Sequence, residues 1–375
     1  MERENLVQEE AGARPPLQTT TTTSSSTTTT TKPSQSSISR KAVVYMVLLA
    51  VQFGLQPALT RRFTPPSVCR STVILVQECL KFCLAFTMLH INGSTKKALE
   101  GWTVYGWISI AGVPAALYAV QNLASLMAYQ NLDALTYNVL NQTKTLSAAL
   151  CCYLVMGKTQ SYMQVVALLL LLVSALVMER IITLDILLFY RRHVDTSSSS
   201  QQQQQSLRNH LSLLMDSTHF SQGIVPLLLA SFISGLAGAL SQKNLEGAGG
   251  KDAYLFSIEL CAVSIIILAV SVLFSADGEL IRTNGFWNNW TPWTMIPILT
   301  NSIGGLIVGL VTKYAGSVRK GFALIFGIFI SGILQAPDSG VSREQIVGGV
   351  LAGISLWMHS AYPAKKGARK TTKQD

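Results

Sequence analysis

The stretch TYNVLNQTKT at residues 136–145 places a phenol, amides and an ammonium group between apolar flanks. On a helix, Tyr137, Asn141 and Lys144 follow a spacing of four and then three residues, so they share one face. A lysine near the centre of a membrane span costs about 2.5–3.5 kcal/mol on insertion scales, so its ammonium should face water or an anion. Because an ammonium is a compact point charge that suits phosphate, the pattern favours a phosphate-binding site.

An ion pair is the alternative explanation for Lys144. Glu78 and Glu259 are the other candidate charges inside apolar segments. Intramembrane lysines usually pair with such a carboxylate or face a water-filled cavity. The residues alone leave both explanations open.

A second polar stripe lies in YAVQN at 118–122. A tyrosine can stack on a base or sugar ring, and a side-chain amide can hydrogen-bond the edge of a base. Ordinary hydrogen bonds between helices would explain the same side chains. Together with the 136–145 stripe, the candidate substrate-binding residues are Tyr118, Gln121, Asn122, Tyr137, Asn141, Lys144, Tyr254, Ser257, Asn301, Lys313 and Lys320.

The segment NSIGGLIVGLVTKYAGSVRKGF at 301–322 combines glycines with two lysines. Its glycines allow close approach of the backbone to a neighbouring helix or to a ligand. Lys313 and Lys320 flank the turn between two apolar segments. They either anchor the segment ends on the cytosolic side or reach a cavity and bind phosphate.

The composition indicates a polytopic membrane protein. Of 375 residues, 49% are hydrophobic and 13% are charged, whereas a soluble domain carries about 25% charge. The net charge of +10 does not indicate nucleic-acid binding, because most basic residues lie at the ends of apolar segments, where they set orientation. Lys and Arg favour a cytosolic location for both termini.

Motifs for catalysis are missing from the sequence. There is no Walker A loop and no HExxH motif, and the six cysteines form no C-x-x-C pair. Asp277 and Glu279 are close in sequence, but a solvated loop explains them best. We therefore expect no enzyme activity, no cofactor and no bound metal.

Ten apolar segments of about 20 residues predict an all-α polytopic membrane protein with ten transmembrane helices. The expected spans are 41–60, 70–90, 103–130, 133–156, 160–178, 223–243, 252–274, 291–312, 318–336 and 344–361. The expected divisions are a disordered Ser/Thr-rich cytosolic tail (1–40), a first half (41–178), a Ser/Gln-rich linker (179–222), a second half (223–361) and a basic cytosolic tail (362–375).

An odd number of spans in each half requires the halves to point in opposite directions, which is the inverted-repeat arrangement of many transporters. Two stripes support the repeat, because their members follow the same i, i+4, i+7, i+11 spacing. These stripes are Tyr118, Asn122, Ser125 and Tyr129 in the third span, and Asn301, Gly305, Val308 and Thr312 in the eighth.

At these residues the chain resembles the nucleotide-sugar transporter family, in the branch of the CMP-sialic acid, UDP-galactose and UDP-N-acetylglucosamine carriers. The resemblance covers about residues 41–361. The matching pieces are YAVQN at 118–122, NLDALTY at 131–137, Gln142 with Lys144, SADGE at 275–279, GF at 285–286 and SIGGL, VTKY and RKGF across 302–322.

The resemblance implies a drug/metabolite transporter fold and exchange of a cytosolic nucleotide sugar for a luminal nucleoside monophosphate by alternating access. It places Tyr118, Asn122, Tyr137 and Lys144 in a central cavity of a Golgi membrane protein, with the ER membrane as the alternative. A UDP-sugar is the expected cargo, with a CMP-sialic acid-like cargo left open. A homodimer is compatible with the sequence.

Two departures leave the choice of base and sugar open. Leu123 stands where relatives often carry a second amide, and Phe256-Ser257-Ile258-Glu259 replaces a stretch that carries Arg-Asn in some relatives. The alternative functions are a sugar-phosphate or other organic-anion exchanger of the same fold, a non-transporting membrane scaffold, and an integral-membrane enzyme.

Overall fold

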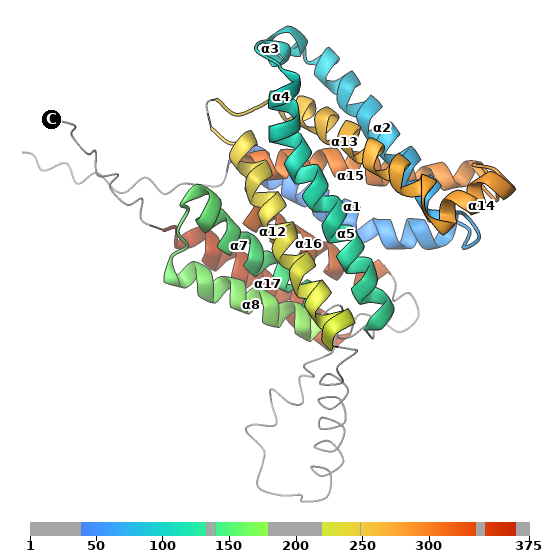
Figure 1. Ribbon diagram of the computed structural model, residues 1–375. Helices are drawn as coiled ribbons and strands as arrows, with labels where there is room; N and C mark the ends of the chain where they lie inside the picture. The colour runs from blue at the N-terminus through green and yellow to red at the C-terminus, as the bar shows by residue number, and fades with distance from the viewer. Residues whose placement is uncertain are drawn as a thin grey trace, which may run out of the picture. The chain divides into compact units, whose positions relative to one another are not determined.

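Helices form all the regular structure of the described residues (Figure 1). The computed structural model describes residues 39–132, 137, 140–178, 220–247, 249–334 and 342–364. Nearly all of the expected N-terminal tail, most of the 179–222 linker and most of the C-terminal tail lie outside these residues.

The described helices come in the following order along the chain. They are α1 (Arg40–Phe63), α2 (Arg70–Ile91), α3 (Thr95–Leu99), α4 (Val104–Trp107), α5 (Val113–Asn131), α7 (Thr143–Met156), α8 (Tyr162–Met178), α12 (Val225–Leu245), α13 (Ala253–Leu273), α14 (Ala276–Asn284), α15 (Met295–Tyr314), α16 (Ser317–Leu334) and α17 (Arg343–Ala361). The π-helical turns η1 (Ile108–Gly112) and η2 (Phe220–Ile224) lead into α5 and α12, and the 3₁₀ turn η3 (Pro292–Thr294) leads into α15.

Every expected span overlaps at least one of these helices, and the chain is a polytopic membrane protein. Within the described residues, seven helical stretches are long and apolar enough to cross a bilayer. α7 and α8 are apolar but shorter, and residues 133–136, 138 and 139 of the expected fourth span are not described. α17 has 19 residues but is not one of the seven. Its first turn carries Arg343 and Glu344, which lower its hydropathy.

The expectation of a solvated loop at Asp277 and Glu279 is wrong, because both residues lie in the first turn of α14. The Ser275 hydroxyl caps this helix by accepting from the Gly278 backbone N–H. Carboxylates in a first turn are stabilised by the helix dipole. The Ser71 hydroxyl donates to Asp277 and so ties α14 to α2.

The two halves of the chain pack against each other in a matched pattern. α1 packs on α15 and α16, and α12, its counterpart by order in the second half, packs on α5 and α7. The pair α2–α15 has the counterpart α13–α5. Helices of the same rank also pair directly, as α2 with α13, α7 with α16, and α8 with α17, which lie side by side in Figure 1.

Contacts between helix ends define two ends of the bundle, which we call end A and end B. At end A, Tyr45 near the start of α1 stacks on Tyr314 at the end of α15, with ring centroids 5.6 Å apart. The pair Lys158–Glu246 joins the ends of α7 and α12 there. At end B, Phe63 stacks on Trp293. The described basic residues at end A are Arg40, Lys41, Lys96, Lys97, Lys158, Lys243, Lys251, Lys313, Arg319 and Lys320, against Arg61, Arg62, Arg70, Arg282 and Arg343 at end B.

Glycine brings α12 and α7 into backbone contact. A Cβ placed on Gly235 would lie 2.6 Å from the carbonyl carbon of Ser147. That atom belongs to the α7 backbone, so a side chain could be accommodated only if the two helices moved apart. By contrast, a Cβ on Gly353 in α17 would meet no atom within 4 Å.

We therefore expect Gly235→Ala to lower the thermal midpoint of the detergent-solubilised protein, at a cost of about 1–3 kcal/mol for overpacking. The matched variant Gly353→Ala should leave the midpoint unchanged or raise it slightly, because alanine favours helix by up to about 1 kcal/mol. Equal midpoints for the two variants would show that α12 and α7 are not in close contact. Size-exclusion chromatography of heated samples measures both.

Candidate functional site

A hollow of about 270 Å³ lies among α2, α5, α12, α13 and α15, and we call it the inner cavity. Two turns of α5 present Tyr118 and Asn122 to it. α15 contributes the second stripe from Gly305 to Thr312, so the cavity is lined by the first two members of the α5 stripe and the last three of the α15 stripe. The lining residues are Glu78, Lys81, Tyr118, Asn122, Ser241, Leu245, Phe256, Ser257, Leu260, Ser264, Gly305, Val308, Gly309 and Thr312.

An ion pair within α2 lies in the wall of this cavity. Lys81 Nζ is 2.5 Å from Glu78 Oε1, and the two side chains are 13% and 11% exposed. The second carboxylate oxygen of Glu78 is buried without a hydrogen-bond partner among the described residues. Gly305 of α15 makes room for the pair, because a Cβ there would lie 2.6 Å from Lys81 Cδ.

Lys81 is a residue that the sequence interpretation missed. Glu78 and Lys81 stand three residues apart, so on a helix they share a face, and that spacing was the available signal. The interpretation treated Glu78 only as a partner for the distant Lys144.

Lys144 has no salt bridge to a described carboxylate. Glu78 is engaged by Lys81 at 2.5 Å, and Glu259 is engaged by Lys251 at 2.5 and 2.6 Å. The ion-pair explanation for Lys144 therefore loses both of its candidate partners. The charge that acts on Lys144 is instead that of Lys320 on α16.

Close packing of α7 on α16 brings these two lysines near each other. Thr145 packs onto Gly321, where a Cβ would lie 2.5 Å from the Thr145 hydroxyl. Both lysines are half-buried, and their like charges repel. Asn141, one turn before Lys144, has a buried side-chain oxygen that accepts no hydrogen bond from any described group. A pair of cations without a local acid is a site that an anion would stabilise.

The lysine pair and the inner cavity are linked through α12. A Cβ on Gly238 would lie 3.9 Å from Lys320 Nζ, and Ser241, three residues later, lines the inner cavity. Three residues of helix rise about 4.5 Å. The cationic group and the polar cavity are thus adjacent on one helix.

Other sequence-predicted residues lie elsewhere. Tyr137 packs edge-on against Tyr129, with centroids 5.3 Å apart, in an apolar cluster with Leu132 and Leu227. It does not line the inner cavity. Gln121 is buried and donates to Asn122 at 3.3 Å, so it orients a cavity residue.

Asn301 and Tyr254 serve contacts between helices. The Asn301 amide donates to Gln77 of α2 at 2.7 Å. Tyr254 interacts with Tyr45, Tyr314 and Asn92 at end A. Its neighbour one turn on, Ser257, does line the inner cavity. Lys313 donates to the Lys251 carbonyl at 3.3 Å and lines a different hollow at end A.

The profile described as "Nucleotide-sugar transporter" matches residues 34–337, which include every helix up to α16. This match covers most of the chain. The chain belongs to the nucleotide-sugar transporter family.

Individual members of this family match over most of their length. A UDP-N-acetylglucosamine transporter from Arabidopsis thaliana is 34% identical over 332 residues, which are 88% of this chain and 95% of the relative. A UDP-N-acetylglucosamine transporter from Rattus norvegicus is 28% identical over 72% of this chain and 77% of the relative. The UDP-galactose translocator of Homo sapiens is 27% identical over 80% and 70%.

One solved crystal structure has a TM-score of 0.59 to this nucleotide-sugar transporter at 10% identity, and the match covers 85% of this chain and 96% of that one. At this identity the likeness concerns the fold alone. A transporter needs a polar cavity among its membrane-spanning helices, and the inner cavity, with Tyr118, Asn122 and Ser257 in its lining, meets that requirement.

For the Glu78–Lys81 pair we expect Lys81→Met to lower stability by about 3–5 kcal/mol, because it leaves a buried carboxylate uncompensated. The double variant Glu78→Gln/Lys81→Met should recover most of that loss. Thermal midpoints of the ligand-free protein measure both.

The control is Lys158→Met, which breaks the Lys158–Glu246 pair, whose side chains are 42% and 38% exposed. It should cost about 1 kcal/mol or less. If Lys81→Met costs no more than this control, Glu78 is hydrated in the cavity and the pair has no special role in stability.

Proposed function

We propose that this family member exchanges a UDP-sugar, such as UDP-N-acetylglucosamine or UDP-galactose, for a nucleoside monophosphate across the Golgi membrane. The observation that carries the proposal is the pair Lys144 and Lys320, two half-buried cations without a described acid partner, beside a cavity lined by tyrosine and amide groups. The printed names of the relatives support a UDP-linked cargo.

The lysine pair is matched in charge to such a cargo. A nucleotide sugar carries two negative charges on its diphosphate, and a nucleoside monophosphate carries close to two near neutral pH. Either anion would neutralise Lys144 and Lys320 and remove their repulsion. The empty carrier keeps that repulsion, which disfavours movement without cargo and favours exchange over leak.

The inner cavity would hold the base and the sugar of the cargo. Tyr118 offers an aromatic face to a base or sugar, and Asn122 and Ser257 offer hydrogen-bonding groups. Lys81 is a third cation at this cavity, and its partner Glu78 could release it to a phosphate oxygen when cargo arrives. Transfer of Lys81 from carboxylate to phosphate would couple binding to a rearrangement of α2.

Alternating access would use the two halves, 41–178 and 223–361, as inverted five-helix repeats. The matched packing of the halves supports this proposal, because the main pairs between them, such as α1–α16 and α12–α7, have counterparts with the halves exchanged. In such transporters one repeat rocks against the other around a central site. We assign end A, where basic residues gather, to the cytosol together with both termini.

Counterflow in proteoliposomes tests the proposal. Vesicles loaded with UMP, CMP, GMP or AMP are offered labelled UDP-, CMP- or GDP-sugars. We expect UMP to stimulate uptake of a UDP-sugar above the level in empty vesicles. Uptake of sugar phosphates alone would identify an organic-anion exchanger instead. A folded protein that gives no uptake with any pair would fit a non-transporting scaffold.

Lys144→Ala should lower exchange about 100-fold or more, because losing one partner of a buried charge contact costs about 2–5 kcal/mol. Its thermal midpoint without ligand should not fall, since the repulsion by Lys320 is removed. The control is Lys41→Ala, an exposed lysine at end A, which should exchange normally. Normal exchange by Lys144→Ala would remove this lysine from the site, and a lowered midpoint would indicate a structural role.

A further inference from the structure

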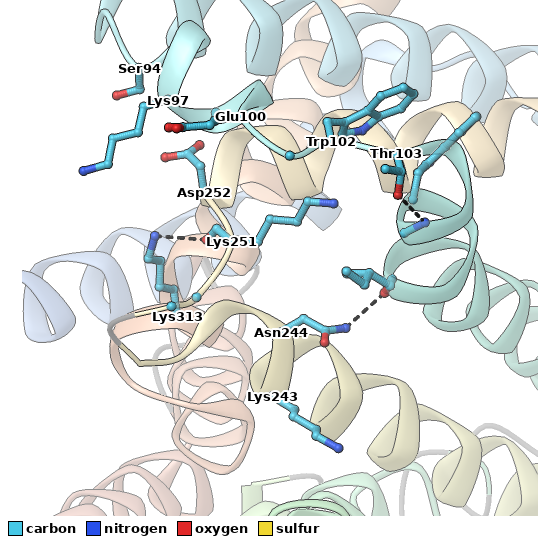
Figure 2. A pocket seen from close by; sticks show the side chains of 17 residues that line it. Ser94, Lys97, Glu100, Trp102, Thr103, Lys243, Asn244, Lys251, Asp252 and Lys313 are labelled. Atoms are coloured by element: carbon cyan, nitrogen blue, oxygen red, sulfur yellow. Dashed lines mark hydrogen bonds between the residues drawn. The ribbon is translucent and has the colours of Figure 1, made fainter.

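A second hollow, of about 660 Å³, opens at end A, and we call it the outer vestibule (Figure 2). Its walls come from the α3–α4 segment, the connection between α12 and α13, and the end of α15. The charged residues of its lining are Lys97, Glu100, Lys243, Lys251, Asp252 and Lys313.

The vestibule carries an excess of positive charge once internal pairs are subtracted. Lys251 is neutralised by Glu259, at 2.5 and 2.6 Å. The Asp252 carboxylate caps α13 by accepting from the backbone N–H groups of Tyr254 and Leu255. Capping leaves the charge of Asp252 in place, so the other three lysines of the lining stand against two carboxylates, Glu100 and Asp252, and exceed them by one.

Two of these lysines are available to a ligand. Lys97 on α3 and Lys243 on α12 are exposed and have no acid partner within the part of the chain that the structure describes. Lys313 donates to the Lys251 carbonyl at 3.3 Å, which leaves other ammonium hydrogens available. An excess of positive charge in a cleft raises the local concentration of anionic ligands.

The vestibule wall also offers fixed aromatic rings. Trp102 and Trp107 stack with centroids 6.3 Å apart. Glu259 holds both indoles, because Trp102 donates to its carboxylate at 2.8 Å and Trp107 donates to its backbone carbonyl at 3.1 Å. Lysines beside indole rings suit a ligand that joins phosphate groups to a planar ring.

Among the described residues, one apolar cluster contributes side chains to the linings of both the vestibule and the inner cavity. Trp107 and Ile110 line the vestibule, whereas Leu245, Phe256 and Leu260 line the inner cavity. All five belong to the same cluster around Ala111 and Ala253. We call this cluster the plug. A ligand in the outer vestibule would therefore contact the same cluster that lines the proposed transport site.

We propose that the outer vestibule is a capture site that holds the phosphate groups of a nucleotide cargo before the plug opens. This inference rests on the proposed function for the identity of the cargo, but the site itself can be tested without transport. The excess of lysines supplies attraction, the indole pair supplies a ring surface, and the plug keeps the bound anion apart from the inner cavity.

The binding test uses inorganic pyrophosphate and the full-length protein in detergent, measured by titration calorimetry. The Lys144→Ala background weakens the inner site. In that background we expect Lys97→Gln/Lys243→Gln to weaken pyrophosphate binding about 3- to 10-fold, in line with the modest strength of exposed charge contacts. The matched control Lys41→Gln/Lys96→Gln changes the same charge at end A with two exposed lysines that do not line the vestibule. Equal weakening by both double variants would overturn the proposal.

The transport test separates capture from translocation. With otherwise native protein, Lys97→Gln/Lys243→Gln should raise the KM for UDP-sugar uptake about 3- to 10-fold and leave the maximal rate unchanged. An unchanged KM would overturn the capture role while exchange itself continued. Absence of exchange in the native protein would overturn the proposed function, and the pyrophosphate titration would still decide whether the vestibule binds phosphate.

The last arm distinguishes a free phosphate from a lipid headgroup. Pyrophosphate binding is measured in phosphatidylcholine nanodiscs with and without phosphatidylserine. Binding that persists in both supports capture of a soluble anion. Binding that phosphatidylserine abolishes would assign the vestibule to a lipid headgroup and overturn the proposal.

Discussion

The arrangement depends on one electrostatic constraint, which is that lysines placed within a membrane protein must be neutralised or hydrated. Lys144 and Lys320 are brought together by the contact of Thr145 with Gly321, and neither has a described carboxylate beside it. Bringing the two ammonium groups close together costs electrostatic repulsion, which the packing of α7 on α16 has to offset. A fold that only needed to pack would place an apolar residue at one of these positions. The arrangement makes sense if an anion completes it.

Other lysines of the same protein show how the constraint is met without a ligand. Lys81 and Lys251 each have a glutamate at 2.5 Å, and both acids are buried. Glu259 holds Lys251 and two tryptophans at once, so it fixes the geometry of end A. Glu78 is paired with Lys81 and retains one oxygen without a hydrogen-bond partner among the described residues. The Lys251–Glu259 pair is thus a closed structural unit, and the Lys81–Glu78 pair is open to exchange of partners.

The sequence predicted most of the helices because a bilayer imposes a length and a hydropathy on each span. It also predicted that the stripes beginning at Tyr118 and Asn301 were related, since equal spacing places them on equivalent helix faces. It could not predict which face turns toward which neighbour. Two of the predicted residues contact other helices or segments instead of the cavity: Asn301 donates to Gln77, and Tyr137 packs on Tyr129. Lys81, which was not predicted, lines the cavity, and its partner Glu78 lies on the same helix.

The plug lies between the outer vestibule, which is basic, and the inner cavity, which is polar. Its buried members lie on η1, α12 and α13, and partly buried side chains from α4 and α15 pack around them. Opening the plug therefore requires these helices to separate. The same elements are tied by polar bonds, from Asn244 to the Ile110 carbonyl at 3.1 Å and from the tryptophans to Glu259. An apolar plug resists an isolated ion, because no group inside it replaces the ion's water. A cargo that brings both phosphate and a ring can engage lysines outside the plug and apolar side chains within it. The plug would therefore favour a cargo that carries both groups over an isolated ion.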